Sequence, residues 1–445
     1  MYLDLIVIRE CLWEWVRRLK TYDCIIVGAG ILGLATAYHI KMKAPNDTIL
    51  IVDKFEGPGF GDTSKSAAAF REFFYSRANI LLARSTIDFY WDLQKNQGID
   101  LGIKWIGYLF LMSHSEFESL VPILKKMSRE GIEYKTYLPE DLEDVGFRTH
   151  VLKDEEARLM NLKNIDVGLF IPRAGILKIE NIVKFYETEL KQLDVDIMYR
   201  TEVKGFILEP TKPIGIPEEP FPWQEIKVSG IRTNRGTFRA KRKIVVAVGA
   251  WCESLLNPIG IGVPIRPKKR QIFVLRAENK SLLKLLRSPK FNKEEILPVT
   301  ILPRGIYIRP EPSENAFWVG YADKLGRAYT LEEDPQPEEE FYIYGIYPVL
   351  TKYIPQFIDI RPINAWAGHY DINVVDGVPI VHEEANLIVV GGTSGSGIMK
   401  ADALGRIVAA TYIGEEYAEL YGGIKIRAKD LSLSERRIEP EKLVI

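Results

Sequence analysis

Cysteine, histidine and an excess of either charge are all scarce in this chain. The three cysteines (Cys11, Cys24, Cys252) and five histidines match no disulfide framework or metal-ligand spacing, so we expect no metal site and a reducing, cytoplasmic setting. The 59 Lys and Arg residues balance 60 Asp and Glu residues, which gives no reason to expect nucleic acid as a partner. No run reaches the roughly 18 apolar residues of a membrane-spanning helix.

The composition is that of a globular protein, with 47% hydrophobic and 27% charged residues in 445, enough for two domains. Residues 1–20 form an N-terminal extension with apolar residues on one helical stripe and basic residues opposite. Three interpretations stay open: a helix in peripheral contact with a membrane, a docking helix, and upstream sequence from a misplaced start. The abundance of Lys, Ile and Glu is typical of thermophiles.

Residues 23–54 read as a strand, a glycine turn, a helix and a second strand. The apolar run at 24–27 predicts a buried parallel strand, and the helix extends to about Met42. The second strand covers 48–52 and ends at Asp53. This order predicts a Rossmann-type dinucleotide site.

Each glycine of the turn has a physical task. Gly28 permits a tight turn, Gly30 lets a pyrophosphate approach the backbone, and Gly33 lets the helix pack closely. The N–H groups at the helix start, at Ile31 and Leu32, attract phosphate. Asp53 is placed to accept hydrogen bonds from the ribose hydroxyls, and its charge disfavours a 2′-phosphate.

Three later segments favour FAD over NAD: the small residues and hydroxyls of 57–71, the buried strand and Gly-Ala turn of 243–251, and the strand and glycine turn of 388–405. An NAD enzyme would leave the last turn unexplained. The residues expected to bind the cofactor are Gly28, Gly30, Ile31, Leu32, Gly33, Asp53, Lys54, Ser64, Lys65, Ser66, Ala67, Val203, Gly249, Trp251, Gly395, Ser396, Gly397, Ile398, Met399 and Lys400.

Together these motifs resemble the D-amino acid oxidase and sarcosine oxidase superfamily of FAD-dependent oxidoreductases over about residues 22–425. Within it, the chain is most similar to the dye-linked L-proline dehydrogenases. That likeness lies in Arg266-Pro-Lys-Lys-Arg270, Leu331-Glu-Glu-Asp-Pro-Gln-Pro-Glu338, Trp366-Ala-Gly-His-Tyr-Asp-Ile372, Thr393-Ser-Gly-Ser-Gly-Ile-Met-Lys400 and Glu441-Lys-Leu-Val-Ile445.

The resemblance implies an α/β fold in which a Rossmann-type FAD-binding domain is interleaved with a substrate domain, built on a mainly antiparallel β-sheet with helices. Alternating residues agree with strands of that sheet at 105–111, 270–276, 305–309 and 316–320. The implied ranges are 21–95, 165–262 and 374–425 for the FAD-binding domain, 96–164 and 263–373 for the substrate domain, and 426–445 for a C-terminal tail.

Arg71 is the first candidate for holding a substrate carboxylate, because it matches a pair-forming arginine of sarcosine oxidases and its planar guanidinium suits a carboxylate. The alternative is a surface arginine. Arg309 lies two residues before Glu311, which stands where D-amino acid oxidases carry a carboxylate-binding arginine. Arg309 is either a substitute for that arginine or part of a structural ion pair.

Two further candidates remain open. Lys400 lies one residue after the lysine position of sarcosine oxidases, here Met399, and that shift rotates a helical side chain by about 100°. Lys400 therefore faces either the flavin's pyrimidine edge or solvent. Tyr370 matches an aromatic residue of the substrate pocket, with ordinary core packing as the alternative.

Two departures from sarcosine oxidases carry information. Gly368 replaces the cysteine that bonds their flavin, so FAD should be non-covalent. Trp318 replaces the lysine that activates oxygen, so the loss of that charge favours a dehydrogenase over an oxidase. The apolar tail 441–445 either frays or docks over the pocket mouth.

The expected function is oxidation of the C–N bond of a small amino acid, and the resemblance alone selects L-proline, which gives 1-pyrroline-5-carboxylate. Electrons would pass to a dye or a quinone-linked acceptor. Alternatives are sarcosine, glycine, a D-amino acid or a hydroxy acid as substrate, and a non-catalytic FAD-binding electron-relay subunit. An oligomer or hetero-complex is compatible with each.

Overall fold

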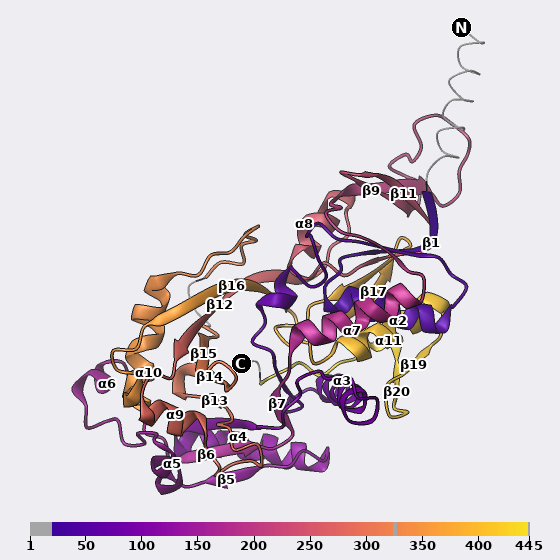
Figure 1. The fold of residues 1–445 in the computed structure, drawn as a ribbon. Coiled ribbons are helices and arrows are strands. Elements are labelled where there is room, and N and C mark those ends of the chain that lie inside the picture. Colours follow the sequence, from indigo (N-terminus) through magenta and orange to yellow (C-terminus); the bar gives the residue numbers. More distant parts are fainter. Residues whose placement is uncertain (1–19, 324–326, 444–445) are drawn as a thin grey trace.

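The computed structural model describes residues 20–323 and 327–443, and these form two eight-stranded sheets (Figure 1). The first sheet has the order β17-β18-β11-β1-β2-β8, with β10 and β9 continuing from β11. Its strands are β1 (Lys20–Val27), β2 (Ile49–Val52), β8 (Asp196–Met198), β9 (Val203–Pro210), β10 (Ile226–Thr233), β11 (Gly236–Val246), β17 (Ile380–Glu384) and β18 (Leu387–Gly391).

The centre of the first sheet is parallel and is buried on both faces. β1 pairs in parallel with β2 and β11, and β11 pairs in parallel with β18. Alternate residues divide between two cores: Ile26 and Ile51 face the helices, whereas Ile25 and Leu50 face the β9–β10 side. This explains why the sequence shows uninterrupted apolar runs there rather than alternation.

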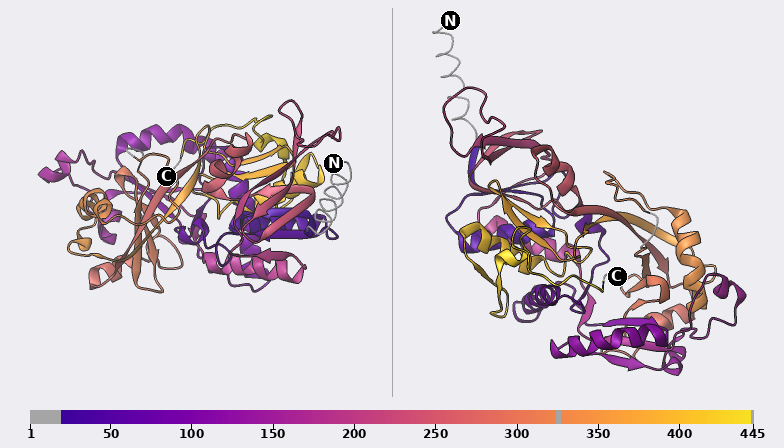
Figure 2. Two further views of the ribbon diagram at one scale, coloured as in Figure 1. Left: turned by 90° about the horizontal axis from the view of Figure 1, so that it is seen from above. Right: turned by 180° about the vertical axis from the view of Figure 1, so that it is seen from behind.

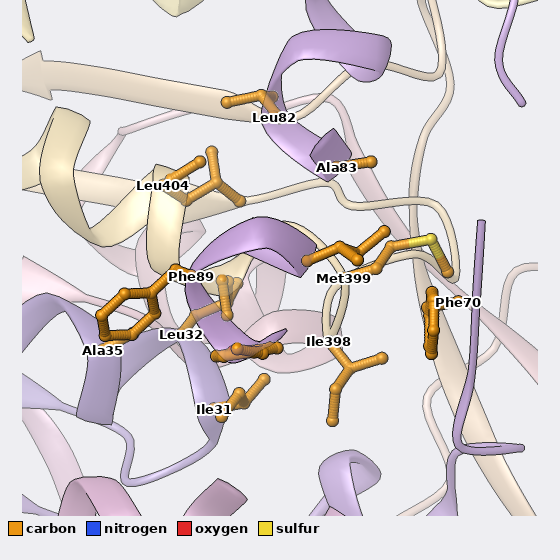
Figure 3. Close-up of a cluster of buried hydrophobic side chains, with 14 of the residues drawn as sticks. Ile31, Leu32, Ala35, Phe70, Leu82, Ala83, Phe89, Ile398, Met399 and Leu404 are labelled. Atoms are coloured by element: carbon orange, nitrogen blue, oxygen red, sulfur yellow. The ribbon is translucent and has the colours of Figure 1, made fainter. Parts of the chain in front are cut away.

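Four helices cover the first face: α2 (Ile31–Lys43), α3 (Arg77–Asn96), α7 (Ile179–Gln192) and α11 (Ala401–Ile413). Figure 3 shows Ile31 and Leu32 of α2 in one cluster with Ile398 and Met399, which immediately precede α11. The glycine turns at the starts of these two helices are thereby held side by side.

The second sheet has the order β16-β12-β15-β14-β13-β4-β6-β5 and is antiparallel except for the β13–β4 pair. Its strands are β4 (Tyr108–Met112), β5 (Lys135–Tyr137), β6 (Val167–Ile171), β12 (Ile265–Arg276), β13 (Val299–Ile301), β14 (Ile306–Glu311), β15 (Ala316–Tyr321) and β16 (Pro362–Asn373). The four strands expected here are present, and the interleaved α/β fold is confirmed.

Alternation along β14 separates the core of the second sheet from the site. Ile306 and Ile308 pack in the core, whereas Tyr307 and Arg309 face a cavity next to the first sheet.

The remaining elements are the helices α4 (His114–Arg129), α5 (Pro139–Val145), α6 (Glu155–Leu159), α8 (Cys252–Leu256), α9 (Lys280–Leu286) and α10 (Tyr347–Tyr353), and the strands β3 (Ala69–Arg71), β7 (Ala174–Ile176), β19 (Tyr417–Glu419) and β20 (Lys425–Arg427).

One predicted domain boundary is wrong. The range 165–262 assigned β6 to the FAD-binding domain, but β6 pairs with β4 and β5 in the second sheet, with Tyr108 opposite Ile171. The pairing joins segments about sixty residues apart, which local periodicity does not reveal. The other predicted boundaries stay predictions. The extension lies outside the described residues apart from Lys20, which begins β1.

Within the described part of the chain, no helix has the length and apolarity needed to cross a membrane. Residues 20–323 and 327–443 also contain no cluster of three or more His, Cys, Asp and Glu side chains suited to a metal ion. Figure 1 and the right-hand view of Figure 2 show the C-terminal tail running from the first sheet towards the second.

Candidate active site

A cavity of about 450 Å³ lies at the carboxyl ends of β1, β2 and β11, where open parallel sheets bind their ligands. Most of the residues expected to bind FAD line it. They are Gly28, Gly30, Ile31, Leu32, Asp53, Lys54, Lys65, Ser66, Ala67, Val203, Gly249, Trp251, Gly395, Gly397 and Ile398.

The first glycine turn is shaped by close backbone contacts. Gly28 has a φ of 106°, and a Cβ atom there would lie 2.5 Å from the carbonyl oxygen of Ala247. A Cβ atom on Gly33 would lie 1.9 Å from the carbonyl oxygen of Gly28, so Gly33 acts in packing and does not line the cavity. A Cβ atom on Gly30 would lie 3.2 Å from Thr63 Oγ1, which is a tight contact, and Gly30 itself lines the cavity.

Asp53 closes the turn as well as lining the cavity. Its carboxylate accepts hydrogen bonds from the N–H of Ala29 (2.6 Å) and of Phe55 (2.8 Å), and burial raises its pKa. The hydroxyl of Thr63 accepts from the N–H of Ile31 at 3.1 Å, so this N–H, expected to face phosphate, has a protein partner. Sequence reasoning missed Thr63, which no motif distinguished.

Two residues to which the sequence assigned no role, Glu333 and His369, line the cofactor cavity. Glu333 pairs with Lys54 (2.5 Å) and accepts from Trp251 Nε1 (3.3 Å). His369 Nε2 accepts from the N–H of Glu332 at 3.3 Å, so its Nδ1 carries the proton. This Nδ1 is buried in the cavity wall without a hydrogen-bond partner, and the carboxylate of Asp62 lies 3.6 Å away, beyond hydrogen-bond distance. An unused donor at this position fits an oxygen-rich ligand such as FAD.

Ser64 does not line the cofactor cavity as expected, and Gly368 stands where no side chain would fit. Ser64 lines neither cavity described here, because its hydroxyl donates to the carbonyl of Gly61 (3.0 Å). A Cβ atom on Gly368 would lie 2.7 Å from Lys65 Cβ. The close approach leaves no room for a side chain at the position where some sarcosine oxidases bond their flavin.

A smaller cavity of about 90 Å³ adjoins the first. The walls shared by the two are Ser66, Ala67, Tyr307, Tyr370 and Gly395. Three residues expected to bind FAD, Ser396, Met399 and Lys400, line only this second cavity. It also brings together four of the five residues expected to act in catalysis, namely Arg71, Arg309, Tyr370 and Lys400.

Arg71 is buried, and the carboxylate of Glu441 in the same cavity wall acts on it without direct contact. Its guanidinium donates to the carbonyl oxygens of Phe73 and of Leu443 (3.2 Å from Nη2) and lies over the ring of Phe74 at 4.2 Å. No carboxylate among the described residues forms an ion pair with it. Because a guanidinium does not lose its proton in proteins, a positive charge remains at the cavity.

Arg309 is buried too, but it pairs with the carboxylate of Glu311 two residues along β14. Arg309 therefore lines the cavity, as expected of a substitute carboxylate-binding arginine, and it also forms the ion pair that was the alternative. This balance makes it a weaker candidate than Arg71 for holding a substrate anion.

Trp318, which stands where sarcosine oxidases carry their oxygen-activating lysine, lines neither cavity. Its ring packs under the guanidinium of Arg309 (4.1 Å) and edge-on to Trp366, with ring centroids 4.9 Å apart.

Tyr370 lies in the walls of both cavities, where a Cβ on Gly395 would come within 2.3 Å of its ring. Gly395 thus permits the close approach of the turn to Tyr370.

Lys400 faces the second cavity rather than solvent and is fully buried. Its Nζ donates to Asn79 Oδ1 (2.7 Å) and Ser396 Oγ (2.5 Å) and lies 4.4 Å from the centre of the Phe74 ring. Burial lowers the pKa of Lys400 to about 7.

The C-terminal tail forms one wall of the second cavity through Glu441 and Leu443. The Glu441 carboxylate accepts from the N–H groups of Tyr75 (2.8 Å) and Ser76 (3.1 Å) and from Asn79 Nδ2 (2.9 Å). Of the two sequence-based alternatives, the described part of the tail is docked rather than frayed.

Comparison with known proteins agrees with this geometry. The curated relatives include FAD-dependent oxidoreductase domain-containing protein 1 of Bos taurus, 24% identical over 87% of this chain and 80% of that protein. Sarcosine oxidase subunit beta of Arthrobacter sp. is 22% identical over 92% of this chain and 91% of that protein. Among solved structures, L-proline dehydrogenase from P. horikoshii has a TM-score of 0.70 at 20% identity, with 89% of this chain and 95% of that chain covered.

Glycine oxidase from Geobacillus kaustophilus shares the fold with a TM-score of 0.65 at 19% identity, covering 89% of this chain and 96% of that chain. The family model described as DAO, FAD dependent oxidoreductase, matches residues 23–411. This chain therefore belongs to the DAO family of FAD-dependent oxidoreductases, and its cofactor is FAD.

Proposed function

We propose that this flavoprotein is a dehydrogenase of a small amino acid, and that the amino acid is L-proline. The observation that carries the proposal is the buried guanidinium of Arg71, which lines a small cavity beside the cofactor cavity and has no carboxylate partner among the described residues. A substrate carboxylate would balance this charge and could accept two parallel hydrogen bonds.

The size and walls of the cavity support a small substrate. A volume of about 90 Å³ suits a few heavy atoms, and the rings of Tyr108, Tyr307 and Tyr370 line it. With its carboxylate on Arg71, a small amino acid would present its C–N bond towards the shared wall at Tyr370 and Gly395. FAD, when bound, supplies the acceptor for the hydride.

The surroundings of Trp318 support a dehydrogenase rather than an oxidase. Reaction of a reduced flavin with oxygen is favoured by a fixed positive charge that stabilises superoxide. The guanidinium that packs on Trp318, that of Arg309, is neutralised by Glu311, and Trp318 itself adds no charge, so the fixed charge that a lysine would supply at this position is missing. Electrons would then leave for a dye in vitro or a quinone-linked carrier in the cell.

L-Proline rests on the sequence resemblance and on the fold shared with L-proline dehydrogenase. The experiment is a visible spectrum of the purified protein under nitrogen, before and after L-proline, followed by admission of air. We expect a yellow protein that L-proline bleaches, that air leaves reduced, and that a dye reoxidises.

Other outcomes would change the proposal in defined ways. Rapid reoxidation in air would make the protein an oxidase. Bleaching by sarcosine, glycine or a D-amino acid, but not by L-proline, would replace the substrate and keep the reaction class. A flavin that no small amino acid bleaches would indicate an electron-relay subunit.

A further inference from the structure

Lys400 is placed where a proton acceptor for the substrate amine is needed. Most amino acid amines are protonated in neutral water, yet a hydride leaves the neighbouring carbon only when the nitrogen has a free electron pair. A group in the wall of the second cavity that takes this proton would let the abundant ammonium form of the substrate react. Lys400 lines the same cavity as Arg71 and follows the glycine turn that lines both cavities.

The hydrogen bonds of Nζ suit a neutral amine. Asn79 Nδ2 donates to Glu441, which turns Asn79 Oδ1 towards Lys400, and Ser396 Oγ donates to the carbonyl of Thr393 (2.6 Å). Both partners of Nζ are therefore acceptors. They use two N–H groups, all that a neutral amine has, and leave its lone pair free.

The ammonium form is satisfied less well. Its third N–H would find no oxygen acceptor among the described residues, only the face of Phe74 at 4.4 Å. Burial lowers the pKa of Lys400, Glu441 and Asp371 raise it, and Arg71 lowers it further. The balance lies near neutral pH, where both forms are accessible.

The other ionisable side chains of this wall are poor proton acceptors. Arg71 and Arg309 stay protonated. Burial raises the pKa of Tyr108 to about 12, and it raises the pKa of Tyr307 and of Tyr370, so these phenols keep their protons.

Glu441 is not a suitable proton acceptor either. Burial alone would raise its pKa, but hydrogen bonds from Asn79 and the N–H of Tyr75 outweigh burial and lower it. Its carboxylate stays ionised and is occupied by three donors. Among the described residues that line the second cavity, Lys400 alone titrates near neutrality.

We propose that Lys400 Nζ accepts the proton that the substrate ammonium loses before its C–N bond is oxidised, an inference that rests on the proposed function. One N–H bond of the substrate breaks and one N–H bond forms at Nζ. The electron pair left on the substrate nitrogen forms the C=N bond as hydride departs from the neighbouring carbon with two electrons. Lys400 ends the step as an ammonium ion and returns the proton to solvent before the next turnover.

The test compares the wild-type holoenzyme with Lys400→Met and Lys400→Arg. Met fills the space without a basic atom, and Arg keeps a charge without accepting a proton. Anaerobic bleaching by L-proline is followed by stopped flow from about pH 6 to about pH 10, which spans the pKa values of Lys400 and of a free amine.

In the wild type, we expect the rate at low substrate concentration to rise with pH and to level near neutrality. Both variants should bleach about 10²–10⁴-fold more slowly at neutral pH, with the rise moved to alkaline pH. Lys191→Met, on the exposed side of α7, is the matched control and should behave as the wild type.

A second readout separates this role from carboxylate binding. Tetrahydrofuran-2-carboxylate has the ring and carboxylate of proline but no amine, and its Kd is measured by the change in flavin absorbance. Lys400→Met should bind it within about twofold of the wild type, because Arg71 holds the carboxylate. A Kd weakened as much as the rate would instead assign the carboxylate to Lys400 and overturn the proposal.

Two further results are decisive. Equal bleaching by wild type and Lys400→Met, with the same pH profile, would remove the role of Lys400 and leave the dehydrogenase intact. A wild-type flavin that no small amino acid bleaches would remove the proposed function itself.

Discussion

Arg71 Nη2 donates to the main-chain carbonyl oxygen of Leu443 at 3.2 Å, which joins β3 to a residue 372 positions later in the chain. The same tail is anchored by the N–H of Glu441, which donates to the carbonyl of Asp376 at 2.8 Å. The residue that we propose to hold the substrate carboxylate is therefore itself held by the C-terminal tail. Substrate affinity should depend on both.

Deleting residues 441–445 should raise KM for the amino acid substrate at least about tenfold, and kcat should fall as well, because Glu441 orients Asn79 towards Lys400. The deletion removes one of the two carbonyl acceptors of Arg71 and opens one wall of the second cavity. None of the described tail residues lines the cofactor cavity, so FAD should stay bound. A loss of about 1.4 kcal/mol of binding corresponds to tenfold in affinity. Dye-coupled steady-state kinetics measure both constants.

The control for the deletion is Glu439→Gln, which removes an ion pair with Lys126 at the protein surface. It should leave KM unchanged. A truncated enzyme with the wild-type KM would show that the docked tail does not cover the substrate site.

Arg71→Lys should raise KM about 10–100-fold, because a lysine lacks the planar fork and a charge-assisted hydrogen bond contributes about 1.5–3 kcal/mol. Arg71→Met should raise it further. Dye-coupled kinetics give KM, and titration with tetrahydrofuran-2-carboxylate gives the affinity for the carboxylate alone.

Arg200→Lys, at an exposed ion pair with Glu56, is the matched control and should leave KM and flavin content unchanged. If Arg71→Lys bound the carboxylate as tightly as the wild type does, another group, with Arg309 the first candidate, would have to hold the substrate.

Gly33→Ala should lower the free energy of unfolding by about 1–3 kcal/mol, since overpacking of this size displaces neighbouring backbone. A Cβ atom there would lie 1.9 Å from the carbonyl oxygen of Gly28, which shapes the turn at the cofactor cavity. The protein should also be purified with less FAD. Thermal unfolding and the ratio of flavin to protein absorbance measure the two effects.

Gly262→Ala is the control for this substitution. A Cβ atom at Gly262 meets nothing within 4 Å, and its φ lies outside the left-handed region. Equal stability and equal flavin content in the two variants would contradict the packing role of Gly33.

The parts of the fold that the sequence predicted are those with a local signature. The strand, glycine turn and helix around Gly28 and Gly33 depend on residues close together in the chain, and the structure reproduces them. The pairing of β6 with β4 depends on contacts between distant segments, so periodicity alone did not assign β6 to the second sheet.

The residues of the site also differ in whether a local sequence pattern could predict them. Arg71 could be selected from its place after the ribose-binding acid, but the partners of Lys400 could not, because Asn79 and Glu441 come from two other segments of the chain. Trp318 was chosen by alignment with a lysine, and alignment does not show that its ring packs against Arg309 and Trp366. His369 and Glu333 lie in two segments that carry the family likeness, but the likeness gave neither residue a role of its own.

The buried amine of Lys400 should make stability depend on pH. Its pKa is about 7 in the folded protein and near 10.5 in an unfolded chain, so between these values the unfolded state binds one more proton. Raising the pH through this window therefore favours the folded state, by about 1.4 kcal/mol per pH unit for one group. Below about pH 7 both states carry the proton, and the contribution is constant.

The measurement is the free energy of unfolding of the apoprotein against pH, for the wild type and for Lys400→Met. The difference between the two curves isolates Lys400, because the other titrating groups are common to both. We expect the wild type to gain stability relative to Lys400→Met from neutral to alkaline pH and the gain to end near the pKa of a free lysine. Parallel curves would mean that the folded protein keeps Lys400 charged, and an ammonium ion has no lone pair with which to accept the substrate's proton.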